Sequence, residues 1–313
     1  MKRLILKKMK NSTLCWNIGT SFEDSSYTLL AWLNTISGIL SVGSNLLVLT
    51  AIYSFSPLRK VSSFFIASLA VADLLVGLLM NPVYTSIFIV KATEDDQHPL
   101  RVAEHWLWLQ TVITSTFTLT AVSIERFIAV KECLRYSEIV TVKRSCYCVA
   151  SIWVFSFFYA SQRLVIHRGE DLPSLWICTT VLTVFLPFFV ILYCYVYIFQ
   201  AAQTQCLRIA ADSVINSRYY KEVLKNKKAA LTLCIVIGLF AFLWSPSLAL
   251  SLWHVSTADP SEIQCIDYLW FWAAFLSFIS SFCNPWVYAI RTKQFRMGFL
   301  KVLRVRALKG RSR

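Results

Sequence analysis

Seven long blocks of apolar residues limit what this chain can fold into. A helix needs about 20 such residues to cross the roughly 30 Å hydrocarbon core of a bilayer, and the fourth block alone falls short of that length. Within lipid, a single segment satisfies all of its backbone polar groups only as a helix, so each block is predicted to be a helix. The blocks cover residues 28–53, 62–90, 102–128, 146–160, 175–200, 229–255 and 268–290.

Composition supports an all-α membrane protein with a seven-transmembrane helix bundle. Hydrophobic residues make up 57% of the chain and charged residues 15%, whereas a soluble domain carries about 25% charged residues. The formal net charge of +14 would suit a nucleic-acid binder only on a soluble module with a basic face. The apolar blocks leave no such module, so membrane lipids are expected as partners and nucleic acid is not.

Basic residues concentrate in one set of connections, which orients the bundle. They follow the first, third and fifth blocks and fill the C-terminal tail, whereas the opposite loops hold few, among them Arg101 and Arg163. The positive-inside rule therefore predicts a multi-pass plasma-membrane protein with a cytoplasmic C-terminus and an extracellular N-terminus. The predicted regions are the extracellular N-terminus (1–27), the transmembrane domain (28–291) and the cytoplasmic helix and tail (292–313).

The N-terminus carries two signals that point in opposite directions. Asn11 begins an acceptor tripeptide for N-glycosylation, which agrees with an extracellular location. The first ten residues are also basic, as at the start of a signal peptide, but the apolar run Leu4–Leu6 is too short to complete one. Because the charge distribution over all the loops outweighs these ten residues, we expect an extracellular, glycosylated N-terminus.

Short motifs stand at fixed places in the predicted helices. Glu125 and Arg126 lie at the end of the third block, and Asn284, Pro285 and Tyr288 lie at the end of the seventh. One such motif is a weak signal, but the whole ordered set is specific. The other motif residues are Gly43, Asn45, Leu69, Asp73, Trp153, Pro187, Tyr195, Phe240, Trp244 and Pro246.

This ordered set resembles the rhodopsin-like (class A) G-protein-coupled receptors. The resemblance implies a receptor that binds an extracellular ligand, activates heterotrimeric G proteins and has no enzymatic activity. A membrane transporter or channel is the alternative, although the sequence shows no internal repeat of the kind that transporters carry. Paired carboxylates, metal-spaced histidines and an activated nucleophile are absent from the sequence, which argues against a membrane enzyme.

Asp73 is the one carboxylate deep inside an apolar block, where ionisable groups are costly and usually functional. The resemblance implies that it binds an allosteric sodium ion in the inactive state, together with polar residues of other helices. No other cofactor is expected. A polar packing network without an ion is the alternative reading. The residues of this set are Asp73, Asn45, Ser115, Ser280, Ser281 and Asn284.

The resemblance also assigns an activation switch to the inner ends of the helices. It implies that Arg126 pairs with Glu125 at rest and turns towards the G protein on activation, beside Tyr195 and Tyr288. An anchor that reaches the membrane interface is the alternative reading of Arg126. Many relatives also hold this arginine with an acid near the start of the sixth helix, but residues 225–228 are Lys-Asn-Lys-Lys. We therefore hypothesise a loosely held resting state with some basal activity.

The sixth block combines a bulky ring with a helix-kinking proline. The resemblance implies that Trp244, next to Pro246, changes position with the ligand and passes the motion through Phe240 to the inner end. Packing within the core is the alternative reading of these residues.

The residues after the seventh block predict a short amphipathic eighth helix. Phe295, Phe299 and Leu300 recur at helical spacing with basic residues between them. This pattern is typical of a helix that lies along the inner leaflet of a membrane.

The cysteines depart from the usual pattern of this class. Most members join the outer end of the third helix to the second outer loop, but Arg101 stands at the first of these positions and 162–177 contains no cysteine. The absence of this disulfide resembles the melanocortin, cannabinoid and lysophospholipid receptors. Cys15 and Cys265 are both expected outside, in an oxidising compartment, and are candidates for a bridge. Cys178 is a competing partner for either.

The ligand is constrained mainly by exclusion. Trp108 stands where amine receptors carry an aspartate, and no lysine between 267 and 290 offers a Schiff base, so neither a biogenic amine nor retinal is expected. Peptide, lipid and nucleoside ligands stay open, and the run from Tyr195 resembles adenosine receptors. Packing against lipid or other helices is the alternative for each aromatic. The expected pocket comprises Glu104, His105, Trp108, Leu109, Val112, Thr179, Thr183, Trp244, Leu248, Ser251, Trp270 and Ala274.

Overall fold

The computed structural model of the chain describes residues 20–91, 98–132, 135–165, 177–211, 217–257 and 259–311. Within these residues every regular element is a helix, and seven helices are long and apolar enough to cross a membrane. The predicted all-α, seven-helix architecture is confirmed. The seven spans are Asp24–Ser54, Val61–Val90, Pro99–Lys131, Val142–Val165, Ile177–Ala201, Leu231–Ser256 and Glu262–Arg291.

The second and fifth spans each contain a π-helical turn, whereas each of the other five lies within one α-helix. We call the end of the bundle that carries α6 and α12 the inner end, and the opposite end the outer end. The elements are α2 (Thr20–Ser54), η1 (Ser56–Leu58), α3 (Val61–Leu75), η2 (Val76–Met80), α4 (Asn81–Val90), α5 (Pro99–Lys131), α6 (Tyr136–Ile139), α7 (Val142–Val165), η3 (Val181–Phe185), α9 (Leu186–Ala211), α10 (Ser217–Ser256), α11 (Pro260–Arg291) and α12 (Lys293–Arg311).

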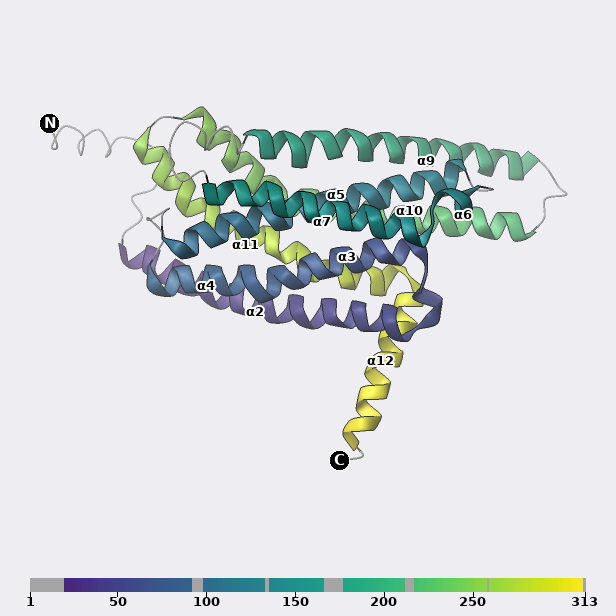
Figure 1. Ribbon diagram of the computed structural model, residues 1–313, viewed down its shortest axis with the longest axis horizontal. Coiled ribbons are helices and arrows are strands. Elements are labelled where there is room, and N and C mark those ends of the chain that lie inside the picture. The colour runs from purple at the N-terminus through teal and green to yellow at the C-terminus, as the bar shows by residue number, and fades with distance from the viewer. Residues whose placement is uncertain are drawn as a thin grey trace.

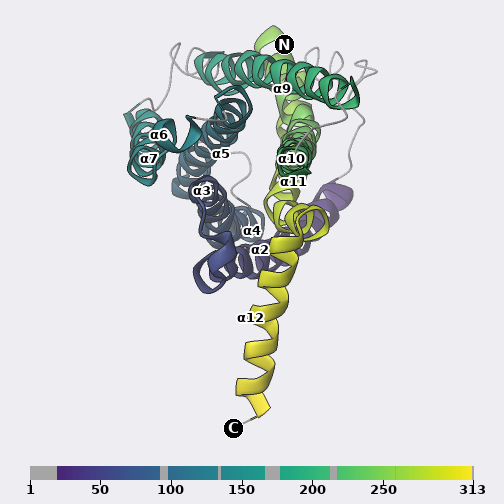
Figure 2. The same ribbon diagram turned by 90° about the vertical axis from the view of Figure 1, so that its right-hand side faces the viewer.

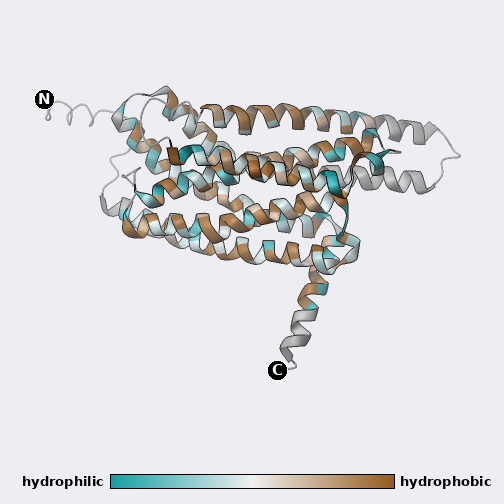
Figure 3. Cartoon of the chain, in the orientation of Figure 1, coloured by the Kyte–Doolittle hydropathy of each residue, from teal (hydrophilic) through white to brown (hydrophobic). Residues whose placement is uncertain are grey.

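The seven spans lie side by side along the long axis of the molecule, and α12 leaves their inner end steeply (Figure 1). An end-on view shows them as a ring, with α7 on the far side of α3 and α5 from α10 and α11 (Figure 2). Apolar residues dominate the spans, and polar residues are more frequent towards their ends (Figure 3). The third span, in α5, is the most buried of the seven. Its side chains are therefore placed to connect the other helices.

The structure corrects several predicted helix bounds. The fourth block, predicted as 146–160, is part of α7, which extends beyond it at both ends and is long enough to cross a membrane. Hydropathy ended this block early because polar residues occupy both extensions. One of them, Arg163, is fully buried in the last turn of α7, so its assignment to an outer loop was wrong. The helices α2, α10 and α11 also begin earlier than their blocks.

Four prolines lie in the interior of the spans, in two kinds of surroundings. Pro82 and Pro187 each closely follow a π-helical turn, η2 and η3 respectively. Proline lacks an N–H and crowds the carbonyl one turn before it, so a locally widened turn is one way for a helix to accommodate it. The helices α10 and α11 continue through Pro246 and Pro285 without ending.

Two glycines bring α2 and η2 into close contact. A Cβ atom added at Gly77 would lie 2.9 Å from the Gly38 carbonyl oxygen and 2.9 Å from Val42 Cγ2, and one added at Gly38 would lie 3.1 Å from the Gly77 carbonyl oxygen. Real Cβ contacts are longer than this, so the backbones can approach only because both residues lack side chains. Small residues at helix interfaces commonly serve this purpose in membranes.

Replacing Gly77 by alanine is expected to lower the free energy of unfolding by about 1–3 kcal/mol, because overpacking a tight contact forces backbone shifts. Gly43 on α2 is the matched control, since an added Cβ there meets nothing within 4 Å. Gly43→Ala should leave stability unchanged or raise it by up to about 1 kcal/mol through helix propensity. Thermal unfolding of both variants in detergent measures the difference, and equal midpoints would contradict the close contact.

The helix α12 packs its apolar face against the inner end of the bundle. Phe295 and Phe299 are buried in one cluster with Tyr288 of α11, and the rings of Tyr288 and Phe295 stack at 5.3 Å. A Cβ atom at Gly298 would lie 3.0 Å from Leu58 of η1. These contacts agree with the amphipathic helix that the sequence predicts after the seventh span.

Candidate functional site

The inner end of α5 holds an ion pair between neighbouring residues. Arg126 donates two hydrogen bonds to the Glu125 carboxylate, from Nη2 at 2.6 Å and from Nε at 2.5 Å. Glu125 is buried and the Arg126 side chain is largely so. A bidentate pair of this kind is among the stronger side-chain interactions in proteins. The pairing that the resemblance implied for the resting state is therefore present.

Tyr136 of α6 is a third member of this group, which the sequence did not single out. Its hydroxyl donates a hydrogen bond to Glu125. Burial first, and then the Glu125 carboxylate, raise the pKa of Tyr136 well above its ordinary value, so the hydroxyl stays protonated and remains a donor. The contact ties α6 to α5 at the inner end.

The two tyrosines expected to receive Arg126 are both buried, on other helices. Tyr195 lies in a cluster with Val122 of α5, and Tyr288 lies in the cluster that receives α12. Among the described residues, both hydrogen bonds of the Arg126 side chain go to Glu125. The arrangement is thus one in which the arginine is held by its neighbour.

A polar core lies deeper in the bundle, around Asp73 of α3. Asn284 of α11 donates from Nδ2 to Asp73 Oδ2 at 2.9 Å, and the Ser281 hydroxyl also lies against this carboxylate. Asn45 of α2 donates to the Ser281 carbonyl at 2.9 Å. Three helices therefore meet at one buried carboxylate. Ser115 is buried on α5, but no hydrogen bond among the described residues joins it to Asp73.

An aromatic group lies between this polar core and the outer end. Trp244 stacks on Phe240 with ring centroids 5.1 Å apart and lies 5.0 Å from Trp108, which in turn lies 5.3 Å from Trp270. The Trp244 indole also donates to the Ser280 hydroxyl at 3.3 Å. The ring expected to act as a switch thus contacts both the polar core and the expected ligand pocket.

The remaining residues of the expected pocket fall into separate places. Val112 and Ala274 join the aromatic group in the outer core cluster. Thr179 shares a hydrogen bond with the Tyr159 hydroxyl at 3.1 Å, while Leu109 packs against Ala160 of α7 and faces away from Trp108. Thr183 and Ser251 each donate a hydroxyl hydrogen bond to a carbonyl one turn earlier in their own helix. Leu248 is half-buried.

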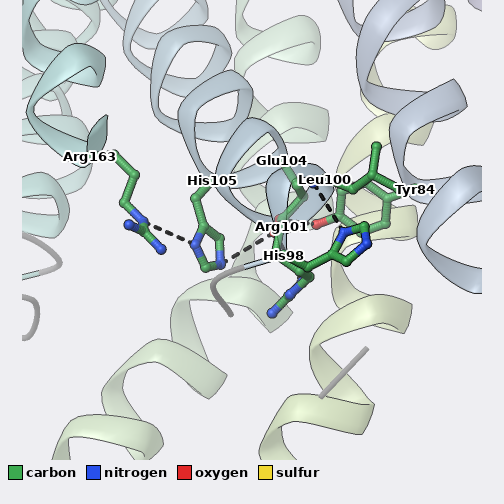
Figure 4. A network of polar contacts seen from close by, with 7 residues as sticks. All are labelled: Tyr84, His98, Leu100, Arg101, Glu104, His105 and Arg163. Carbon is green, nitrogen blue, oxygen red and sulfur yellow. Dashed lines mark hydrogen bonds and ion pairs between the residues drawn. The ribbon is translucent and has the colours of Figure 1, made fainter. Parts of the chain in front are cut away.

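The outer end carries a network of buried charges (Figure 4). The fully buried Glu104 carboxylate accepts hydrogen bonds from the Tyr84 hydroxyl at 2.6 Å and from Arg101 Nη1 at 3.0 Å. His105 Nε2 lies 3.3 Å from the same carboxylate, and Arg163 Nε lies 3.2 Å from His105 Nδ1. Glu104 and His105 of the expected pocket therefore belong to this network.

The sequence analysis missed three members of this outer network, Tyr84, Arg101 and Arg163. Arg101 precedes Glu104 by three residues, the spacing at which helical side chains meet, and this signal was available. Arg163 reaches α5 from another helix, and no local pattern predicts such a contact.

The structure narrows the disulfide prediction. Cys265 is disulfide-bonded, whereas Cys178 is a free, exposed cysteine, so the competing role of Cys178 was wrong. Cys15 lies outside the described residues, and its pairing with Cys265 stays a prediction. The glycosylation acceptor Asn11 also lies outside them.

Comparison with known proteins agrees with these features. The model of the family "7 transmembrane receptor (rhodopsin family)" matches residues 44–288. The adenosine receptor A2b of Gallus gallus is 30% identical over 305 residues, which covers 87% of each chain. The melanocortin receptor 5 of Rattus norvegicus is 26% identical over 92% of this chain and 87% of its own. The adenosine receptor A2a of Homo sapiens is 28% identical over 87% of this chain and 71% of its own.

These matches extend over nearly the whole bundle and include all four groups of residues described above. Both named groups of relatives are receptors, and the resemblance stated from the motifs is confirmed. The chain is not an enzyme; it belongs to the rhodopsin family of seven-transmembrane receptors.

Proposed function

We propose that this receptor binds an extracellular ligand and activates a heterotrimeric G protein at the inner end of the bundle. The observation that carries the proposal is the buried Glu125–Arg126 pair at the inner end, in which Glu125 is the one ion-pair partner of Arg126 among the described residues. The plasma membrane, with the N-terminus outside, follows from the charges of the loops.

The described helices offer a route from ligand to G protein. A ligand among the outer residues would displace Trp108 or Trp244, whose rings are in contact. Trp244 contacts Phe240 and the Ser280 hydroxyl, so its movement reaches the polar core and the inner half of α10. A ligand shifts such an equilibrium by the difference between its affinities for the two arrangements. The helices would act as packed elements with two discrete positions.

A sodium ion suits the polar core. The core offers oxygen ligands: the Asp73 carboxylate and the neutral oxygens of Ser281 and the other buried hydroxyls. Hard cations such as sodium prefer oxygen ligands. Asp73 is 3% exposed, so a cation there would offset a buried charge. Asp73 and Ser281 would hold the ion, with Asn45, Ser115, Ser280 and Asn284 around them. The ion would supply positive charge that favours the inactive arrangement.

The ligand class follows from what the outer residues lack. Trp108 is buried among aromatic rings, without the carboxylate that an amine requires at this position, and α11 contains no lysine for a retinal Schiff base. The relatives are named as adenosine and melanocortin receptors, which bind different chemistries. A nucleoside, a peptide and a lipid are therefore the three classes to test.

Libraries of nucleosides, peptides and lipids, applied to cells with a G-protein dissociation readout, test the proposal. A hit should depend on Arg126: Arg126→Ala is expected to lower ligand-stimulated activation by about tenfold or more, since hydrogen bonds to charged groups contribute about 1.5–3 kcal/mol. Surface expression of the variant serves as the control for folding. Substrate flux that survives Arg126→Ala, without G-protein activation, would show a transporter instead.

A further inference from the structure

His105 stands between two charged side chains at the outer end of α5. Its Nε2 atom lies 3.3 Å from the Glu104 carboxylate, and its Nδ1 atom lies 3.2 Å from Nε of Arg163 on α7. Figure 4 shows the three side chains in line, with the imidazole in the middle. The imidazole ring therefore bridges an acid of α5 and a base of α7.

The partners of the ring define its protonation state. A guanidinium group has donors only, so the contact with Arg163 requires a lone pair on Nδ1. The ring is then neutral, with its single proton on Nε2, the atom that faces the Glu104 carboxylate. One more proton can enter only at Nδ1, the atom that faces the Arg163 guanidinium.

The charged and titratable groups around His105 come from three helices. They are Glu104 and Arg101 on α5, Tyr84 on α4 and Arg163 on α7 in the part of the chain that the structure describes. Glu104 and Arg163 are fully buried, whereas the His105 side chain keeps 12% of its surface exposed. The imidazole is thus the member of this chain of contacts that water reaches.

We propose that His105 is a binding site for a proton from the extracellular medium, and that occupation of this site opens the contact between α5 and α7 and changes signalling. The signalling part rests on the function proposed above. A proton on Nδ1 removes the acceptor that Arg163 uses and places two cations in contact at low dielectric, where their repulsion is strong. Arg163 must then move away from His105.

This movement would occur next to the expected ligand pocket. Trp106 and Leu109, within one turn of His105, pack against α7, and Trp108 lies in the same turn of α5 at the centre of the aromatic group. An ordinary imidazole titrates near pH 6.5, so histidine is the side chain suited to respond to the pH of extracellular fluid. The proton would act as a second, modulating ligand of the receptor.

Two non-titrating variants separate the parts of the bridge. His105→Asn places an amide oxygen near the position of Nδ1 and keeps an acceptor for Arg163, whereas His105→Gln reaches towards Glu104 with an amide donor. His98→Asn is the first control, because the His98 ring caps α5 by accepting from the Leu100 N–H and asparagine is a good N-cap. His254→Asn, at an exposed position of α10, is the second control.

The proton site itself is tested by NMR of the full receptor in nanodiscs, with isotopically labelled histidine. The chain has four histidines, and His105→Asn identifies the signal of interest. We expect the neutral form protonated on Nε2 at pH 8, and uptake of a second proton between pH 8 and pH 5. A ring protonated on Nδ1, or one that stays neutral throughout, overturns the proposal whether or not the receptor couples to a G protein.

The effect on signalling is tested in cells whose external pH is stepped between 8 and 5.5. Glu125→Gln, introduced in every receptor compared, supplies a ligand-independent signal. In receptors that keep His105, including both controls, G-protein activation should change by about fivefold between the two pH values, which corresponds to about 1 kcal/mol. In both His105 variants, G-protein activation should not change with pH. A pH response retained in both His105 variants, or absent with His105 present, overturns the link to signalling. Absence of any signal at any pH would instead count against the proposed function.

Discussion

Replacing Glu104 by alanine is expected to lower the free energy of unfolding by about 3–5 kcal/mol, the usual loss when one partner of a buried ion pair is removed. Glu104 is fully buried, and Arg101, with only 8% of its side chain exposed, lies 3.0 Å away. Without the carboxylate, the Arg101 charge keeps its burial and loses this counter-charge. At about 1.4 kcal/mol per tenfold change, the ratio of folded to unfolded receptor should fall by a factor of a hundred or more.

The loss of stability in Glu104→Ala should have two parts, one from the missing charge and one from the missing hydrogen bonds. Glu104→Gln keeps an oxygen for the Tyr84 hydroxyl, which lies 2.6 Å from the carboxylate, and replaces the charge and the oxygen that accepts from Arg101 with a neutral amide group. In Glu104→Gln combined with Arg101→Met, the buried cation is also gone, so stability should recover towards wild type. Thermal unfolding and surface expression measure both effects, and a double variant no better than Glu104→Gln would contradict the charge argument.

An exposed ion pair of the same end provides the control. Lys91 and Asp24 lie 2.8 Å apart, with side chains 74% and 60% exposed. Their hydrogen bond raises the pKa of Lys91 above its ordinary value. Solvent screens such pairs, so they contribute little to stability. Asp24→Ala should therefore leave unfolding nearly unchanged, and a loss as large as that of Glu104→Ala would show that burial is not the cause.

Hydropathy predicts the spans of this chain well because the requirement to satisfy backbone groups in lipid is local to each segment. It fails at their ends, where polar side chains are buried by partners on other helices. Arg163 shows the limit: by composition it belongs to a loop, but His105 and the helices around it bury it in α7. Such a contact depends on packing and leaves no signal in the nearby sequence.

The motifs locate the inner site and the polar core more reliably than the outer pocket. Asp73 and Asn284 meet as the resemblance implied, because their positions are set by where each helix crosses the bundle. Leu109 was placed in the pocket with Trp108, yet it packs on α7. Adjacent residues of a helix point about 100° apart, so two neighbours rarely face one cavity. The periodicity alone would have separated them.

Replacing Glu125 by glutamine is expected to raise ligand-independent G-protein activation by about ten- to a hundredfold. The Glu125 carboxylate accepts two hydrogen bonds from Arg126, and a hydrogen bond to a charged group contributes about 1.5–3 kcal/mol. Removing the charge weakens the arrangement that holds Arg126, and the equilibrium shifts towards the released state by the same free energy. The stretch Lys225–Lys228, just before the sixth span, includes no acid that would compensate.

Two further variants decide whether this rise comes from the buried group around Glu125. Tyr136→Phe removes one donor to Glu125, so it should raise basal activation by a smaller factor and add little to Glu125→Gln. Glu138→Gln breaks an exposed pair of the same end, in which Arg135 lies 3.6 Å from Glu138 and both side chains are about 70% exposed, and it should have no effect. If Glu138→Gln raises activation as much as Glu125→Gln, loss of negative charge at the inner end is the cause. If only Glu125→Gln and Tyr136→Phe act, the bond between Glu125 and Arg126 at the end of α5 is what restrains the receptor at rest.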